Sequence, residues 1–300
     1  IKDIKNYLRY DGETCESVVG YVPTTTINRK PLGGGSPYEW VNLLSDLRKN
    51  SFVGDGENNE YYLDVEEFDS DYTPRVWVND TLITYGTGFT FDASKGIIKF
   101  VTTPDAPETA GRDNVIIEFK KSVTGYKDRI KYCQLVTTFD GCVFFGGNPD
   151  YPNVIWNSYV DNPSYIPDIN YYNEGLDLAK VKAMIPANNA LWVIKEPSQA
   201  NTTVFYHNPV TVTKNDIVVN EYASTHSSVS LGCNATGINF NDDIVFFSDR
   251  GMEGINGDVN SEQVLAHRSS LIDAMLLNES NYKNMILEEW EGYLLVCIDN

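Results

Sequence analysis

Polar turns followed at once by apolar strands recur four times along the chain. The copies are residues 139–145 (FDGCVFF), 188–194 (NNALWVI), 241–247 (NDDIVFF) and 290–296 (WEGYLLV). One apolar position, equivalent in all four, is occupied in turn by Val143, Leu191, Ile244 and Leu294. A spacing of about 50 residues is typical of the four-stranded blades of a β-propeller, and we expect these positions to be buried between stacked sheets. The alternative is chance recurrence in a β-rich chain, since the copies share a pattern and not a sequence.

A second pattern occupies residues 54–121, where short apolar strands alternate with turn residues. The predicted strands are 61–65, 75–78, 89–91, 97–100 and 115–119. Between them lie the turn Asn79-Asp80, a turn at 92–96 and a polar loop at 104–112. Five or so short strands with turn signals between them predict a small β-sandwich.

These patterns predict an all-β chain in which a small β-sandwich is inserted into β-propeller-like repeats of four-stranded sheets. We expect residues 1–53 to begin the propeller-like domain, 54–121 to form the inserted sandwich, and 122–300 to continue the propeller-like domain beyond this segment. Within 1–53 the sequence predicts a weak strand at 16–22 and another at 39–44. The Gly/Pro-rich run at 30–37 reads as a flexible connection, because no Lys-Ser/Thr pair or helix follows it to make a phosphate-binding loop.

The composition agrees with a globular β protein. Hydrophobic residues make up 42% of 300 residues, and 19 Tyr, 13 Phe and 5 Trp favour strands. No run approaches eighteen apolar residues, so we expect no membrane insertion. The chain opens without Met and closes within an apolar run, so we interpret it as a segment of a longer polypeptide.

The formal charge of −19 and the sequence pI of about 4.4 count against nucleic-acid binding. Binding to phosphates requires Lys and Arg that displace counterions. An acidic surface repels DNA, which is useful where DNA must slide past without sticking. The alternative is that the charge only keeps the chain in solution.

Five cysteines at wide spacings, with no CxxC, argue against both a disulfide framework and a zinc cluster. Reduced cysteines in apolar strands behave as small hydrophobes, which fits assembly in a reducing cytosol.

The densest polar and aromatic run spans residues 144–167. We single out Asn148, Tyr151, Trp156 and Tyr165 as residues of a possible ligand-binding or inter-subunit loop. Tyr and Trp rings stack on sugars, and Asn side chains bind hydroxyls. The competing interpretation is a long structural loop fixed by prolines, and the turn preferences of Pro and Asn favour it.

The sequence shows few of the residue patterns that are typical of catalytic sites. The three histidines, His207, His226 and His267, show no HxH or HExxH spacing. Residues 228–232 (SVSLG) lack the first Gly of a nucleophile elbow, and the SxDxGxTW box of propeller sialidases is absent. Adjacent acids at 242–243 and 288–289 point to opposite faces of a strand and cannot act on one bond. We therefore expect no catalytic residue, metal site or cofactor, and no enzyme activity.

The polar and aromatic run at residues 144–167 also resembles a known family. Its phrases FFGGNPDYPN at 144–153, an Ile/Trp strand, and DNPSY at 161–165 are similar to those of tail-nozzle and packaged-DNA-stabilisation proteins of tailed bacteriophages. Further matching phrases are 42–45, 191–196 (LWVIKE), 237–239 and 245–251. The module at 54–121 similarly resembles small β-modules of phage tail and fibre proteins.

This resemblance implies a noncatalytic virion protein that forms a homo-oligomeric ring below the portal, through which DNA passes without specific binding. It implies contacts with other tail or portal and adaptor proteins, and assembly in the bacterial host cytoplasm. The alternatives are a tail-associated carbohydrate-binding or polysaccharide-degrading protein and a bacterial surface adhesin.

Overall fold

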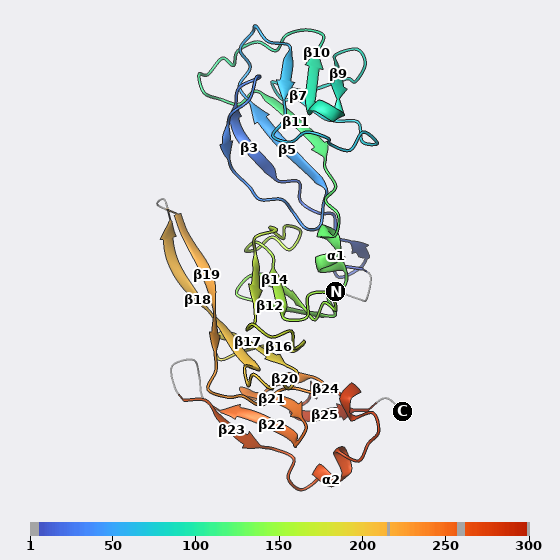
Figure 1. Cartoon of the computed structure of the whole chain (residues 1–300), viewed down its shortest axis with the longest axis vertical. Coiled ribbons are helices and arrows are strands. Elements are labelled where there is room, and N and C mark those ends of the chain that lie inside the picture. Colours follow the sequence, from blue (N-terminus) through green and yellow to red (C-terminus); the bar gives the residue numbers. More distant parts are fainter. Residues whose placement is uncertain (1–5, 215–216, 257–261, 299–300) are drawn as a thin grey trace. The chain divides into compact units, whose positions relative to one another are not determined.

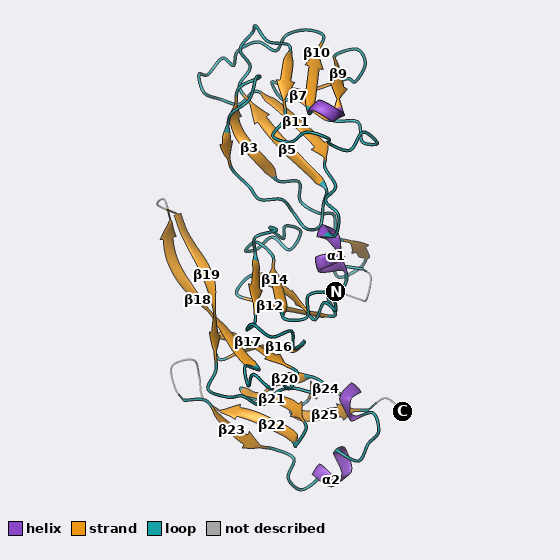
Figure 2. Ribbon diagram, in the orientation of Figure 1, coloured by secondary structure: helices purple, strands orange, loops and turns teal. Residues whose placement is uncertain are grey.

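The computed structural model consists almost entirely of β-strands, which confirms the predicted all-β class (Figure 2). It describes all residues except 1–5, 215–216, 257–261 and 299–300. The outermost residues of the expected propeller-like segments, 1–5 and 299–300, therefore lie outside the described residues. Regular helix in the described part is limited to the short α1 (Tyr126–Lys131) and α2 (Asp273–Leu276) and to two single-turn 3-10 segments. None of the described helices is long and apolar enough to cross a membrane.

The chain divides into two compact units. The first, here called the sheet-stack unit, comprises residues 1–17, 128–163 and 170–300. The second, the sandwich unit, comprises residues 18–127 and 164–169. The chain thus leaves the sheet-stack unit and returns to it twice, and each unit is described below by itself.

The sandwich unit pairs a six-stranded sheet with a three-stranded sheet. The larger sheet has the order β4 (Ser36–Pro37), β3 (Thr24–Arg29), β5 (Leu47–Phe52), β11 (Val115–Lys120), β7 (Arg75–Val78), β8 (Thr81–Ile83). The smaller sheet has the order β6 (Glu60–Tyr62), β10 (Ile97–Phe100), β9 (Phe89–Asp92). Alternate side chains of both sheets form one core, in which Val76, Ile117 and Phe119 are buried with Tyr61 and Ile98. The upper part of Figure 1 shows these strands.

This unit begins near residue 18, earlier than the expected 54. The reason is strand pairing between segments far apart in the chain: β5 lies antiparallel to β11 along its whole length although β6 to β10 lie between them in sequence, and β3 joins β5 in parallel. Such pairing links segments far apart in sequence, which local patterns do not reveal. Asn79 and Asp80 form the expected turn between β7 and β8.

The predicted strands at 16–22 and 39–44 are wrong. Only Cys15–Ser17 forms a short strand (β2) in the first region, paired with β1 (Leu8–Tyr10). In the second, the Asn42 side chain donates to Tyr21 O and Ser164 O, both at 2.8 Å, and its Oδ1 accepts from Leu44 N and Ile166 N. Asn42 is buried, and its side-chain bonds, together with the backbone bonds Leu43 N to Ile166 O and Asp168 N to Val41 O, attach residues 164–169 to the sandwich unit without a regular strand.

The sheet-stack unit contains four successive antiparallel sheets, three of them four-stranded with neighbours in chain order. The first comprises β12 (Leu135–Phe139), β13 (Cys142–Gly146), β14 (Val154–Asn157) and β15 (Tyr171–Asn173). The second comprises β16 (Val181–Ala187), β17 (Ala190–Lys195), β18 (Val204–Lys214) and β19 (Ile217–His226). The third comprises β20 (Gly237–Phe240), β21 (Asp243–Ser248), β22 (Gly251–Asn256) and β23 (Val264–His267). The fourth comprises β24 (Ile286–Trp290) and β25 (Tyr293–Cys297). This repeat of blade-like sheets is the one that the sequence predicts.

Candidate interaction surface

Each of the four stacked sheets of the sheet-stack unit opens with the same hairpin. A two-residue turn joins its first strand to its second, and both turn residues have positive φ. The four turns are Asp140-Gly141, Asn188-Asn189, Asn241-Asp242 and Glu291-Gly292. Positive φ at both central positions defines the type I′ turn, whose twist matches that of paired strands, and Asn, Asp and Gly tolerate it best. The turn residues therefore determine where the second strand of each of these sheets begins.

The four apolar positions predicted to be equivalent are equivalent. Each is the second residue of the second strand and lies opposite the penultimate residue of the first. Leu191 and Ile244 are fully buried as expected, whereas Val143 and Leu294 are only partly buried. Val143 belongs to the first sheet of the series, which has another repeat sheet on one side only, and Leu294 packs on the third sheet from the last sheet, which has only two strands.

Alternation along β17 sends its side chains into two different cores. Leu191 and Val193 pack with residues of the first sheet, while Trp192 and Ile194 pack with residues of the third. All six residues of β17 are buried, because sheets cover both of its faces.

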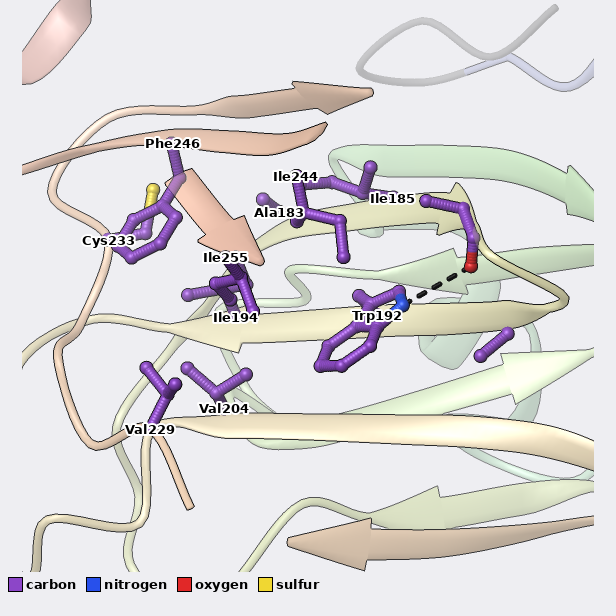
Figure 3. Close-up of a cluster of buried hydrophobic side chains, with 12 residues drawn as sticks. Ala183, Ile185, Trp192, Ile194, Val204, Val229, Cys233, Ile244, Phe246 and Ile255 are labelled. Carbon is purple, nitrogen blue, oxygen red and sulfur yellow. Dashed lines mark hydrogen bonds between the residues drawn. The ribbon is translucent and has the colours of Figure 1, made fainter. Parts of the chain in front are cut away.

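Cores of this kind lie between the first and second, second and third, and third and fourth sheets. Figure 3 shows the middle one, where Trp192 lies among aliphatic side chains and its Nε1 donates to Ala187 O at 3.2 Å. Phe246 and Ile255 of the third sheet pack against it from the opposite side. The first strands β12, β16, β20 and β24 are neighbours in that order. The sheets therefore stack face to face in chain order.

The outer face of the fourth sheet is exposed and largely apolar, with the carboxylate of Glu288 among its side chains, opposite Leu295. Strand register places its side chains together, with Trp290 opposite Tyr293 and Ile286 opposite Cys297. The exposed fractions are 62% for Ile286, 59% for Trp290, 69% for Tyr293 and 41% for Leu295. We call these four residues with Cys297 the open face. The alternate residues Leu294 and Val296 point the other way, into the core with the third sheet.

Equivalent positions in the second sheet show what the open face lacks. By repeat alignment Tyr293 and Leu295 correspond to Ala190 and Trp192, both of which the third sheet buries completely. A contiguous apolar patch with two aromatic rings is typical of an interaction site. The open face is thus suited to cover by another apolar sheet.

The residues singled out from the 144–167 run have separate local roles. Asn148 is buried, and its Nδ2 donates to Asp128 O and Arg129 O while its Oδ1 accepts from Asp150 N. Tyr151 is exposed and meets the buried Trp156 edge to face, with ring centroids 5.8 Å apart. Tyr165 belongs to the sandwich unit, where its hydroxyl bonds both the N and the O of Trp40. Of the four residues, Tyr151 and Trp156 are in ring contact. The hydrogen bonds of Asn148 hold the backbone of a loop, as expected of a structural loop.

A buried polar cluster escaped sequence reasoning altogether. The Glu174 carboxylate accepts from Ser224 Oγ and approaches His207 Nε2, both at 2.7 Å. The buried Lys195 ammonium donates to Glu174 O at 2.8 Å and pairs with Asp177. Glu174, Lys195 and His207 are all fully buried. Because Ser224 bonds the carboxylate and not the imidazole, the arrangement fastens the 174–177 segment to the second sheet rather than activating a nucleophile.

A second histidine lies nearer the surface of the third sheet. His267 Nε2 lies 2.7 Å from Asp273 Oδ2, and its Nδ1 lies 3.0 Å from Glu253 Oε1. The hydrogen bond to Asp273, followed by that to Glu253, raises the pKa of His267 above its ordinary 6.5. Hydrogen bonds from Ser269 and then His267 lower the pKa of Asp273. This group links β23 to α2.

Metal-binding groups do not gather in the described ranges, where no three His, Cys, Asp or Glu side chains could hold an ion. Cys133, Cys142 and Cys233 are buried, and Cys15 and Cys297 are exposed. Burial raises the pKa of the Cys233 thiol to about 12, so it packs as an apolar group.

Comparison with known proteins adds no relative to this description. The chain matches no protein-family model, and a search of curated proteins finds no significant match.

Proposed function

We propose that this chain is a structural component of a bacteriophage tail, a nozzle or DNA-stabilisation ring below the portal through which DNA passes. The observation that carries the proposal is the face-to-face series of repeated sheets ending in the open face. A noncatalytic scaffold needs self-complementary surfaces rather than a reactive centre. The sequence phrases shared with nozzle-type proteins give the proposal its biological setting, a virion assembled in the bacterial cytoplasm.

Ring formation follows from how the sheets stack. The second and third sheets each bury one face on the preceding sheet and the other on the following sheet, whereas the fourth sheet has a neighbour on one face only and leaves the open face exposed. Repetition of one such contact closes a ring when the rotation between neighbours divides a full turn. In a closed series the neighbouring first strands β12, β16, β20 and β24 would line the centre.

Sedimentation of the full chain over a range of concentrations tests the proposal. Wild-type protein is expected to associate, and the double variant Tyr293→Asp/Leu295→Asp to remain monomeric, because it removes two apolar side chains and adds two carboxylates beside Glu288 that any covering sheet would desolvate. The matched control is Tyr171→Asp/Leu178→Asp, which changes an exposed tyrosine and an exposed leucine of the same unit outside the open face. The control should associate as wild type does.

Electron microscopy of the associated wild-type fraction should show rings with a central opening. A wild-type monomer at every concentration would overturn the proposal. So would association that the open-face variant leaves unchanged, because the contact would then lie elsewhere.

A further inference from the structure

The sandwich unit carries a groove of about 400 Å³ on the outer face of its six-stranded sheet. Its lining residues are Thr24, Lys49, Ser51, Trp77, Asp80 and Ile116. This volume lies within the range of small-molecule sites, roughly 300–1,000 Å³. The groove residues belong to the sandwich unit, whereas the proposed tail function rests on the sheets of the other unit.

Strand register arranges the groove residues in two parallel rows. Ile116 of β11 lies between Ser51 of β5 and Trp77 of β7, which gives one row across three neighbouring strands. Two residues along the strands, Glu118 lies between Lys49 and Arg75 and makes the second row. Side chains two residues apart on a strand share a face, so both rows face outward while Val76 and Ile117 enter the core.

The first row offers an aromatic surface held in place. The Arg75 guanidinium carbon lies 4.9 Å from the centroid of the Trp77 ring, and Ile116 is its cross-strand neighbour. An indole fixed in this way loses little further freedom when a ligand stacks on it. The pyranose rings of sugars present apolar C–H faces that suit such a surface.

The second row supplies polar groups, two cations that share one buried carboxylate. The Glu118 side chain is buried. Its carboxylate lies 3.5 Å from the Arg75 guanidinium and 3.9 Å from the Lys49 ammonium, and it accepts a hydrogen bond from Tyr72 Oη at 2.8 Å. At the end of the groove Asp80 pairs with Arg112 at 3.3 Å. Each of these cations lies beside a carboxylate, and the two charged residues that line the groove, Lys49 and Asp80, cancel each other, which disfavours a nucleic-acid or phosphate ligand.

A peptide strand is also a poor occupant. Backbone N–H and C=O groups of β5, β11 and β7 bond one another across the sheet, so none is available on its face for strand addition. Recognition must come from side chains alone, and those present are one indole, one aliphatic group, two hydroxyls and one charge of each sign. This combination suits a ligand that is apolar on its ring faces and hydroxylated at its edges.

We propose that the groove binds a neutral oligosaccharide, with one pyranose ring stacked on the Trp77 surface that lines the groove. Lys49 and Asp80 bond hydroxyls on either side, and Thr24 and Ser51 bond those that lie over β3 and β5. The site binds and does not cleave, because the groove holds one carboxylate and no acid pair. The sandwich unit thereby attaches the particle or the chain to a glycan surface.

The test is a titration of the full chain with cellohexaose, maltohexaose and chitohexaose, followed by intrinsic tryptophan fluorescence and by backbone amide shifts. At least one of the three should give saturable binding, with the shifts centred on β5, β7 and β11. Trp77→Ala should raise the dissociation constant at least tenfold, and Trp77→Phe should raise it less because it keeps an aromatic face.

Trp40→Ala is the matched control, since Trp40 is an exposed tryptophan of the same unit whose hydrogen bonds to Tyr165 run through its backbone. It should leave binding unchanged. The proposal is overturned if none of the three saccharides binds saturably, or if Trp77→Ala and Trp40→Ala weaken binding equally. Tighter binding of a thymidine hexanucleotide or inorganic phosphate than of any saccharide would also overturn it.

Discussion

Glu291 is an unusual residue to begin a type I′ turn. Its φ is +50°, and the three equivalent turns begin with Asp140, Asn188 and Asn241. A side chain that bonds its own backbone makes the left-handed region accessible to Asn and Asp, whereas Glu has no such advantage. The fourth hairpin is thus held by sheet packing more than by its turn.

Glu291→Asn is therefore expected to stabilise the protein by up to about 1 kcal/mol in urea unfolding, because Asn tolerates positive φ better than Glu. Gly292→Ala should destabilise it by about 1 kcal/mol, since φ is +79° there although nothing lies within 4 Å of the added Cβ. A destabilising Glu291→Asn would show that its carboxylate, and not its backbone, matters to the hairpin.

His267 gives the third sheet a pH dependence. Its folded-state pKa is raised above 6.5, so the stabilisation from its bonds is complete below that pH and is lost as pH rises through the folded-state pKa. Asp273 has a lowered pKa, so its contribution is present above 3.8 and is lost as pH falls through the folded-state value. The linkage between β23 and α2 is therefore strongest between these limits.

Imidazole proton shifts measured against pH should place the His267 pKa above 6.5 in wild type. Asp273→Asn should lower that pKa, because it removes the largest cause of the shift, while Ser228→Ala, remote from this group, should leave it unchanged. An unaltered His267 pKa in Asp273→Asn would assign the shift to Glu253 instead.

At the scale of elements, β17 and β25 show what stacking adds to one repeated strand. Leu191 and Leu294 occupy the same repeat position, but Leu191 is fully buried between two sheets and Leu294 is only partly buried. The pair provides a matched comparison of the same substitution in the same strand context. Any difference in stability then reports the packing around the side chain.

Leu191→Ala should lower the free energy of unfolding by about 2–5 kcal/mol, the range for a leucine removed from a well-packed core. Leu294→Ala should lower it by less, because water already reaches that side chain. Urea unfolding of both variants beside wild type measures the difference. Equal losses would mean that the fourth sheet is as well packed as the second.

The elements most readily predicted were those specified locally. Turn residues with a following apolar run located all four second strands, and Asn79-Asp80 located the β7–β8 hairpin, because both signals lie within a few residues. The pairing of β3 and β5 with β11 escaped because it joins segments on either side of a long excursion. Glu174 and His207 carry no motif and meet only because the segment that follows β15 packs against β18, so their cluster could not be predicted from sequence spacing.

At the scale of the molecule, charge is the property that most constrains the proposed role. The chain has 42 Asp and Glu against 23 Lys and Arg, a formal net charge of −19. Several basic side chains are already paired with carboxylates, among them Lys99 with Glu60 and Arg268 with Asp243. A surface that guides DNA without holding it needs this excess of negative charge.

We therefore predict no measurable affinity for double-stranded DNA. A protein with a basic groove binds nonspecifically with dissociation constants of about 10⁻⁴–10⁻⁶ M near physiological salt, and its affinity rises steeply as salt is lowered because counterions are released. For this chain, fluorescence anisotropy of a labelled 30-base-pair duplex should stay flat up to about 100 µM protein, both near 150 mM and near 50 mM salt. The measurement at low salt is the decisive one, because lowering the salt strengthens both repulsion and attraction between the protein and DNA. A surface that repels DNA gives no anisotropy change at 50 mM salt, whereas a weakly basic surface would bind there. Affinity that appears at 50 mM and falls with added salt would reveal a cationic track and would contradict passage without adhesion.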